Sequence, residues 1–166
     1  MTVEASDGGG ASNQLGNFVI QVESGPLAGL FLRDASGSTG IQGSIGFAEE
    51  PGDALKWHLD GTKVSLVQSP AKQLQSYPLG ETSPVGLLDA AGGVSSDMLP
   101  MQCTVGDAPG RKVICTEASS TLYNLFIACS FTNSVNVLLI SKVGYIACEA
   151  AGGRGYLSLS LKAVPI

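Results

Sequence analysis

From Phe18 onward the chain is a series of short runs in which hydrophobic and polar residues alternate, and turn residues separate one run from the next. Phe18, Ile20 and Val22 show this alternation, and Gly25-Pro26 ends their run. A period of two residues is typical of strands, whereas an amphipathic helix needs a period of 3.6. No run of ten or more residues holds the helical period. The pattern therefore predicts an all-β fold.

The apolar runs fall into three sets of about four, and each set spans about 45 to 50 residues. The first two sets end in predicted hairpins at residues 57–66 and 103–115, and the first hairpin turns at Asp60-Gly61. Residues 122–129 would also suit a buried helix, but their β-branched and aromatic flanks favour a strand. A threefold repeat of four strands predicts a β-trefoil-like barrel, with a β-sandwich as the alternative.

Length and composition predict the domain organisation. The 166 residues are enough for one domain whose core needs neither a metal nor a disulfide to form. Residues 1–16 have few apolar side chains and include Gly8-Gly9-Gly10, so we expect a flexible leader there. We expect residues 17–166 to form a single β domain.

Charge and hydropathy limit the partners of the chain. Its formal net charge is −5 and it has no basic stripe, so we do not expect it to bind nucleic acid. The longest apolar run, residues 137–140, is far shorter than the ~20 residues that cross a bilayer. Membrane insertion is therefore not expected.

Four cysteines indicate an oxidising compartment: Cys103, Cys115, Cys129 and Cys148. Cys103 and Cys115 are equally spaced about Pro109, so a hairpin there would place them opposite each other and allow a disulfide. Of the three possible pairings, this one leaves Cys129–Cys148 as the second bridge. Four buried free thiols are the alternative. Because no Cys-x-x-Cys occurs and there is one histidine, we expect no metal site.

The chain offers few groups for catalysis. Serine and cysteine nucleophiles usually need an imidazole base, and the only histidine, His58, lies in an alternating run where we expect it to point outward. A carboxylate pair that hydrolyses glycosides is the other option. Its candidates fall mostly in predicted turns: Glu49, Glu50, Asp53, Asp60, Asp89 and Asp107. We therefore expect no catalytic residues and no cofactor.

Aromatic side chains are the candidate platforms for sugar binding, namely Trp57, Tyr77 and Tyr123. Trp57 alternates in phase with Leu55 and Leu59, which favours a core position for its ring. Tyr77 lies in a loop-like setting and is the better exposed candidate. The sequence does not decide among them.

A second functional hypothesis concerns the segment between Cys103 and Cys115. A disulfide there would make residues 107–111 a rigid loop, with Pro109 at its centre and Arg111 as a basic anchor. Such a loop would suit a protease inhibitor that presents it to an active site.

Three segments carry a family resemblance: NFVIQVESG at residues 17–25, KWHLDGTKVSLV at residues 56–67, and LFIAC at residues 125–129 with the later Cys148. Through them, the chain from Phe18 to its C-terminus resembles the PhiA-type secreted cell-wall proteins of filamentous fungi. The family's Gly-rich signature has only a faint counterpart at residues 79–86, and Cys103 and Cys115 are additional. The resemblance implies a secreted, wall-associated protein and supplies no catalytic residue.

These observations predict a non-enzymatic protein that is secreted or associated with a fungal cell wall. It would coat a surface or bind glycans, with cell-wall polysaccharide as the partner. A protease inhibitor is the alternative, and a hydrolase with a carboxylate pair ranks third.

Overall fold

The alternating runs form strands in the computed structural model, and the predicted all-β fold is confirmed. The structure describes residues 15–39, 44–70, 72–76, 82–89, 99–117, 123–130, 136–142 and 154–166. The strands are β1 (Phe18–Val22), β2 (Phe31–Asp34), β3 (Ile45–Ala48), β4 (Trp57–Asp60), β5 (Lys63–Leu66), β6 (Lys72–Ser76), β7 (Thr82–Asp89), β8 (Leu99–Val105), β9 (Lys112–Glu117), β10 (Tyr123–Ser130), β11 (Asn136–Lys142), β12 (Arg154–Leu159) and β13 (Leu161–Pro165). Short helical turns are α1 (Ser36–Thr39) and η2 (Pro51–Asp53). No helix among these residues is long and apolar enough to cross a membrane.

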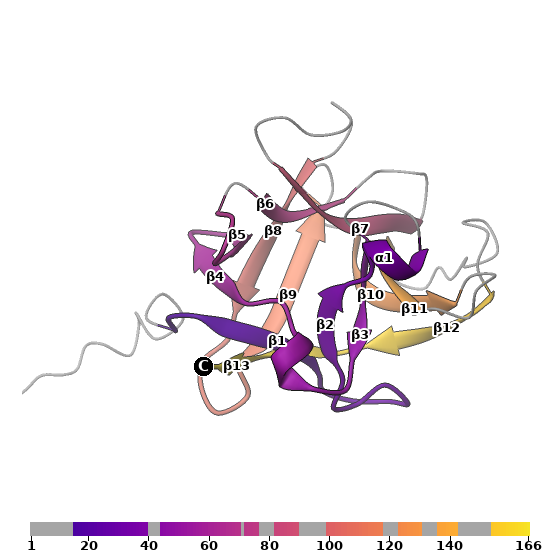
Figure 1. The fold of residues 1–166 in the computed structure, drawn as a ribbon, viewed down its shortest axis with the longest axis horizontal. Coiled ribbons are helices and arrows are strands. Elements are labelled where there is room, and N and C mark those ends of the chain that lie inside the picture. The colour runs from indigo at the N-terminus through magenta and orange to yellow at the C-terminus, as the bar shows by residue number, and fades with distance from the viewer. Residues whose placement is uncertain are drawn as a thin grey trace, which may run out of the picture.

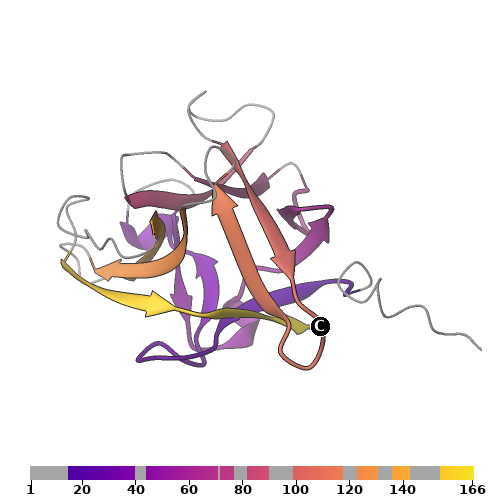
Figure 2. The ribbon, with the colours of Figure 1, turned by 180° about the vertical axis from the view of Figure 1, so that it is seen from behind.

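The strands pair into one sheet in the order β12-β10-β11-β7-β6-β5-β4-β1-β13-β9-β8, with β2 and β3 attached beside β1. The two ends of this path, β12 and β8, are different strands that do not pair, so the thirteen strands do not close into a single barrel. β6 pairs with β8 as well as with β5 and β7. Figures 1 and 2 show the strands arranged around a shared interior, with β2 and β3 next to β10 and β11.

The first and last strands lie side by side (Figure 1). β1 and β13 run antiparallel over five residue pairs, from Phe18 opposite Pro165 to Val22 opposite Leu161. Phe18 also lies opposite Trp57 at the start of β4. Residues far apart in the sequence are therefore joined by a continuous ladder of backbone hydrogen bonds.

One face of each central strand forms the core. In β1, Phe18, Ile20 and Val22 are 0%, 0% and 1% exposed and belong to the main apolar cluster. Val19, which alternates with them, is buried in a smaller cluster on the opposite face. Leu15 also belongs to the main cluster, although the sequence assigned it to the leader. Packing of the domain therefore begins before residue 17.

The predicted hairpin at residues 57–66 is confirmed. β4 and β5 pair along their length, and the ladder ends with Asp60 opposite Lys63. The turn is therefore made by Gly61 and Thr62, one residue later than the sequence indicated. Gly61 has a φ of 63°, a left-handed conformation that glycine adopts without steric cost.

The ambiguous segment at residues 122–129 is a strand over its described residues, 123–129, as its flanks indicated. It forms most of β10, which pairs with β11 on one side and β12 on the other. The run predicted as a strand at residues 143–148 lies outside the described residues.

Candidate functional site

Buried and exposed residues alternate over residues 101–105 of β8 and 112–115 of β9. Met101, Cys103 and Val105 of β8 are buried, and so are Val113 and Cys115 of β9. Cys103 lies directly opposite Cys115, and their sulfurs are bonded at 2.07 Å. The predicted disulfide is confirmed, and it belongs to the apolar core of the domain.

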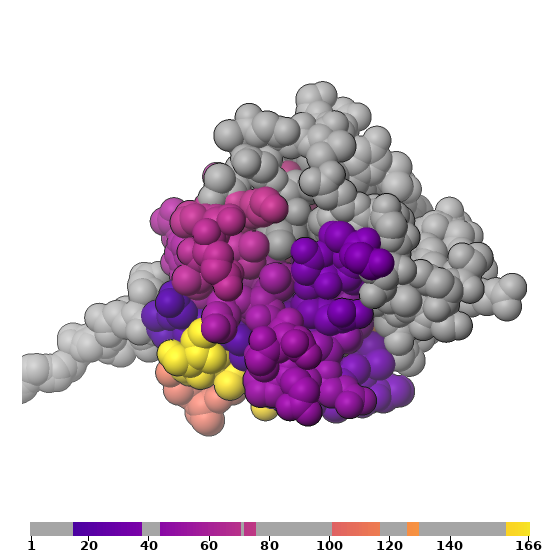
Figure 3. Space-filling model, in the orientation of Figure 1, coloured from indigo at the N-terminus to yellow at the C-terminus, as the bar shows by residue number. Residues whose placement is uncertain are grey.

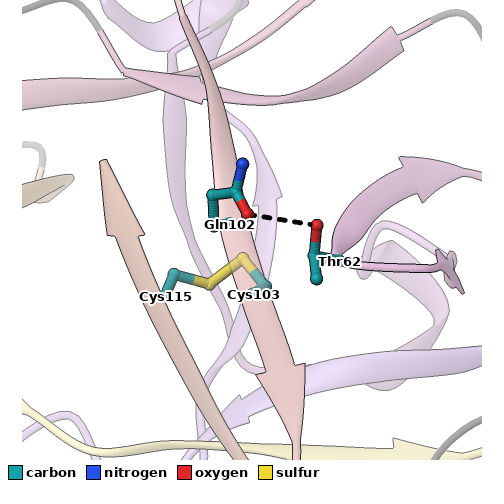
Figure 4. The surroundings of a disulfide bond; sticks show 4 residues. All are labelled: Thr62, Gln102, Cys103 and Cys115. Atoms are coloured by element: carbon teal, nitrogen blue, oxygen red, sulfur yellow. Dashed lines mark hydrogen bonds between the residues drawn. A yellow bond between two sulfur atoms is a disulfide. The ribbon is translucent and has the colours of Figure 1, made fainter. Parts of the chain in front are cut away.

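The disulfide also fastens the hairpin to its neighbour. The Cα atoms of Cys103 and Cys115 are 4.1 Å apart, close to the spacing of an antiparallel pair that does not exchange hydrogen bonds. The N–H of Cys103 instead donates to the backbone oxygen of Thr62 at 2.6 Å. Beside it, the Thr62 hydroxyl donates to Oε1 of Gln102 at 3.4 Å (Figure 4). The turn between β4 and β5 is thus held against β8.

The hairpin of β8 and β9, which the Cys103–Cys115 disulfide bridges, ends in an exposed loop, residues 106–110. The N–H of Gly106 donates to the oxygen of Lys112 at 2.9 Å, and the N–H of Arg111 donates to the oxygen of Asp107 at 3.0 Å. Figure 2 shows the loop beside the C-terminal end of β13, and in Figure 3 the two segments adjoin on the surface. The loop is therefore a closed turn on a rigid base.

The two residues predicted for an inhibitor loop have different environments. Pro109 is exposed and follows a cis peptide bond. Arg111 is only partly exposed, its φ of 50° is left-handed, and its Nη1 is buried without a hydrogen-bond partner. Recognition of an extended segment needs a β backbone and a side chain directed at the partner. Arg111 is therefore not a free basic anchor, and this part of the prediction is corrected.

Of the three candidate aromatic platforms, the structure describes the side chain of Trp57 alone, and that side chain is buried. Trp57 is 0% exposed and packs in the main core cluster, so no face of its ring is available to stack on a sugar. The core position that the alternation favoured is confirmed, and the platform role is corrected. Tyr77 lies outside the described residues. Tyr123 begins β10, but its side chain is not among those described.

The only histidine lies in a row of polar residues that crosses three strands. His58 of β4 is half-buried and opposite Ser65, which in turn is opposite Gln73 of β6. Ser65 is 2% exposed, and Oε1 of Gln73 is buried without a partner. Among the described atoms no hydrogen bond joins the His58 and Ser65 side chains. The sequence did not indicate this row, because it forms by pairing between strands.

The candidate carboxylates do not converge. Those whose side chains the structure describes are all exposed: Glu49, Glu50, Asp53, Asp60 and Asp107. Asp60 lies opposite Lys63, and Asp89, at the end of β7, occupies the position opposite Lys72. Within the described ranges, no three histidine, cysteine or acidic residues are close enough to hold a metal ion.

Asp34 at the end of β2 has a shifted pKa. Burial alone would raise the pKa of this carboxyl, but hydrogen bonds from the hydroxyl and backbone of Ser36 outweigh burial, with help from the charges of Lys72 and Arg33. The N–H of Ser36 donates to Oδ1 of Asp34 at 2.8 Å. The net result is a pKa below the ordinary value of 3.8. The carboxylate stabilises the turn that follows β2.

The second pair of cysteines is described only in part. Cys129 of β10 is fully buried and is disulfide-bonded. Cys148 lies outside the described residues, so the pairing Cys129–Cys148 stays a prediction.

Two lysines that the sequence did not single out face each other near the loop. Lys112, at the start of β9, lies opposite Lys162 of β13. Fifty residues separate them in the chain. No local pattern could have found the pair, since only the register between β9 and β13 brings it together.

Comparisons with known proteins give this chain no relative: no family model, no curated protein and no solved structure matches it. The resemblance to PhiA-type proteins stays a prediction, and function is inferred from the chain's own residues.

Proposed function

We propose that this chain is a β-trefoil domain, secreted or cell-wall-associated, that coats a surface or binds glycans without catalysing a reaction. The strand pairing supports the trefoil. Taken in order, β6, β5, β4, β1, β13, β9 and β8 each pair with the next, and β8 pairs back to β6. In the proposed fold these strands form the barrel, which leaves few free edges.

Three further hairpins support a threefold repeat. They are β2–β3, β6–β7 and β10–β11, and all are antiparallel. One strand precedes each hairpin (β1, β5 or β9), and β4, β8 or β13 closes the unit. The proposed repeats are residues 18–60, 63–105 and 112–165, so the hairpins at 57–66 and 103–115 join repeats rather than end them. A β-sandwich would need two separate sheets, whereas one path links these strands.

The observation that carries the extracellular part of the proposal is the Cys103–Cys115 disulfide. Both cysteines are at most 1% exposed and fill positions of the core. Reducing compartments keep such pairs open, so a disulfide built into the core supports an oxidising environment. The resemblance to PhiA-type proteins supports the cell wall as the place where the protein acts.

Peptide mapping without reduction tests the compartment. We expect one peptide pair joined through Cys103 and Cys115 and a second joined through Cys129 and Cys148. Four thiols that react with an alkylating agent in the native protein would contradict secretion. Crossed pairing would contradict the hairpin register.

A pull-down on insoluble wall polysaccharides tests glycan binding. We expect the protein to leave the supernatant with at least one of chitin, β-1,3-glucan and an insoluble acidic polysaccharide. An equal amount of heat-unfolded protein serves as the control. Full recovery in the supernatant with every polymer would remove the glycan-binding version and leave surface coating.

One observation favours the alternative of a protease inhibitor, namely the exposed loop at residues 106–110 on its stapled base. Arg111 cannot serve as its anchor, so the loop itself, around Pro109, would have to enter the active site. Serine and cysteine proteases unaffected at micromolar concentrations of the protein would exclude this function.

A further inference from the structure

Lys112 and Lys162 form a pair of like charges on the outer face of the sheet. They are directly opposite in the antiparallel ladder of β9 and β13, so their side chains lie on the same face with Cβ atoms roughly 5 Å apart. The neighbouring pair, Val113 and Leu161, is 3% and 1% exposed. Because successive residues of a strand point to opposite faces, the lysines point outward.

Two other lysines of the ladders lie opposite acidic residues, whereas Lys142 lies opposite Tyr123. Lys63 is opposite Asp60, and Lys72 is opposite Asp89. Like charges directly opposite are destabilising, whereas opposite charges stabilise. Among the described ladder positions, Lys112 and Lys162 are the one place where two lysines lie opposite each other.

The surroundings of the pair do not neutralise it. On β8, the neighbour of Lys112 is Gly106, whose N–H donates to the Lys112 oxygen at 2.9 Å. On β1, the residue opposite Lys162 is the neutral Gln21. Glu23 and Asp107 are the nearest carboxylates along the chain, one diagonal to Lys162 and one in the loop. Within the described part, neither forms an ion pair with the lysines.

Arg111 lies next to the pair in the chain but does not belong to it. It immediately precedes Lys112, and its backbone oxygen accepts the N–H of Ala163, the residue after Lys162, at 2.9 Å. Its Nη1 is buried without a hydrogen-bond partner. The outward-facing positive charges where the β8–β9 hairpin joins β13 are therefore those of Lys112 and Lys162, on a chain whose net charge is −5.

We propose that this cationic pair, Lys112 and Lys162, is the contact site for an acidic polysaccharide, one whose sugars carry carboxylates or sulfates. The assignment rests on the proposed glycan-binding function and names its substrate class. Two lysines opposite each other on one face can each pair with an oxyanion, on one sugar or on neighbouring sugars. A polymer presents such groups repeatedly, so one polymer chain can contact both lysines at once.

Affinity electrophoresis of the full chain in gels that contain polygalacturonate tests the site, with dextran as the neutral polymer. We expect polygalacturonate to retard the protein at low salt and to release it as salt rises, since salt screens exposed charges. K112Q/K162Q should weaken binding roughly tenfold. The matched control K63Q/K72Q removes the same charge elsewhere and should bind as the natural protein does.

Thermal unfolding provides a second readout that does not depend on a ligand. Because the two lysines repel each other, K112Q/K162Q should melt at the same temperature as the natural protein or higher, whereas K63Q/K72Q should melt lower. A loss of binding by K112Q/K162Q with its melting temperature retained would then reflect the site and not the fold.

Several results would overturn the assignment, and they separate it from the proposed function. Binding to chitin or glucan without binding to polygalacturonate would overturn the site and leave glycan binding intact. Unchanged polygalacturonate binding by K112Q/K162Q would also overturn the site. A single-stranded DNA oligonucleotide could also bind the protein as tightly as polygalacturonate does and lose this binding in K112Q/K162Q. That result would overturn the polysaccharide assignment. Failure to bind any glycan would overturn the proposed glycan binding itself.

Discussion

At the scale of single residues, Trp57 is a reporter of the core. It is the only tryptophan, it is 0% exposed, and its Nε1 has no hydrogen-bond partner. We predict that the fluorescence emission of Trp57 is blue-shifted and that iodide quenches it only after unfolding. Added glycans should leave this emission unchanged. Trp57→Ala should lower the free energy of unfolding by about 3–5 kcal/mol, because it leaves a cavity. Trp57→Phe, which keeps a ring and removes the unpaired donor, should cost less. Iodide quenching of the native protein would contradict the buried position.

Asp34 predicts a dependence of stability on pH. Its pKa is lowered in the folded protein, so its contribution is complete above the unfolded pKa of 3.8 and is lost as pH falls through the lower folded value. Asp34→Asn keeps an acceptor for the Ser36 N–H but cannot change its charge. The difference in melting temperature between the two proteins should therefore shrink as pH falls below about 4. A constant difference between pH 6 and pH 2 would contradict the shift.

At the scale of elements, the β8–β9 hairpin depends on its disulfide. Cys103→Ala/Cys115→Ala opens a bridge that spans 12 residues and should cost about 3 kcal/mol of unfolding free energy on the chain-entropy account. Because both sulfurs are buried, we expect a reductant to reach them only through unfolding. Urea denaturation and timed alkylation check both points. Thr62→Val is the control, since it removes only the exposed side-chain bond to Gln102. Rapid reduction of the native protein would contradict the core position.

The β4–β5 hairpin depends on one glycine. A Cβ atom added to Gly61 would meet no other atom within 4 Å, so the cost of a side chain there comes from its φ of 63° alone. Gly61→Ala should lower the free energy of unfolding by about 1 kcal/mol. Gly52→Ala meets equally open space without a left-handed φ, and it should be near neutral. Equal effects of the two substitutions in urea denaturation would contradict the turn geometry.

At the scale of the whole molecule, the pairing of β1 with β13 joins the two ends of the domain. Removal of residues 161–166 deletes all five partners of β1 in this ladder, together with Leu161 and Ala163 of the core. We predict that the shortened chain shows no cooperative thermal transition by circular dichroism. Ile166→Ser, at a residue that is 63% exposed, should unfold like the natural protein. A cooperative transition in the shortened chain would mean that the core closes without β13.

The sequence by itself determined what depends on neighbouring residues. Alternation placed the strands, including β10, whose flanks correctly outweighed a helical interpretation. Equal spacing about Pro109 found the Cys103–Cys115 bridge, because hairpin partners are fixed by distance from the turn. The phase of Trp57 with its neighbours indicated the core. Each of these rests on a period or a spacing within about a dozen residues.

Only the tertiary structure decided what depends on distant partners. The left-handed backbone of Arg111 and its buried Nη1 follow from its place against β13, so the sequence took this side chain for a free anchor. The polar row of His58, Ser65 and Gln73 and the pair of Lys112 and Lys162 exist because of the register between strands. Such register is set when the core closes, since a shift of one residue would send every buried side chain to the opposite face.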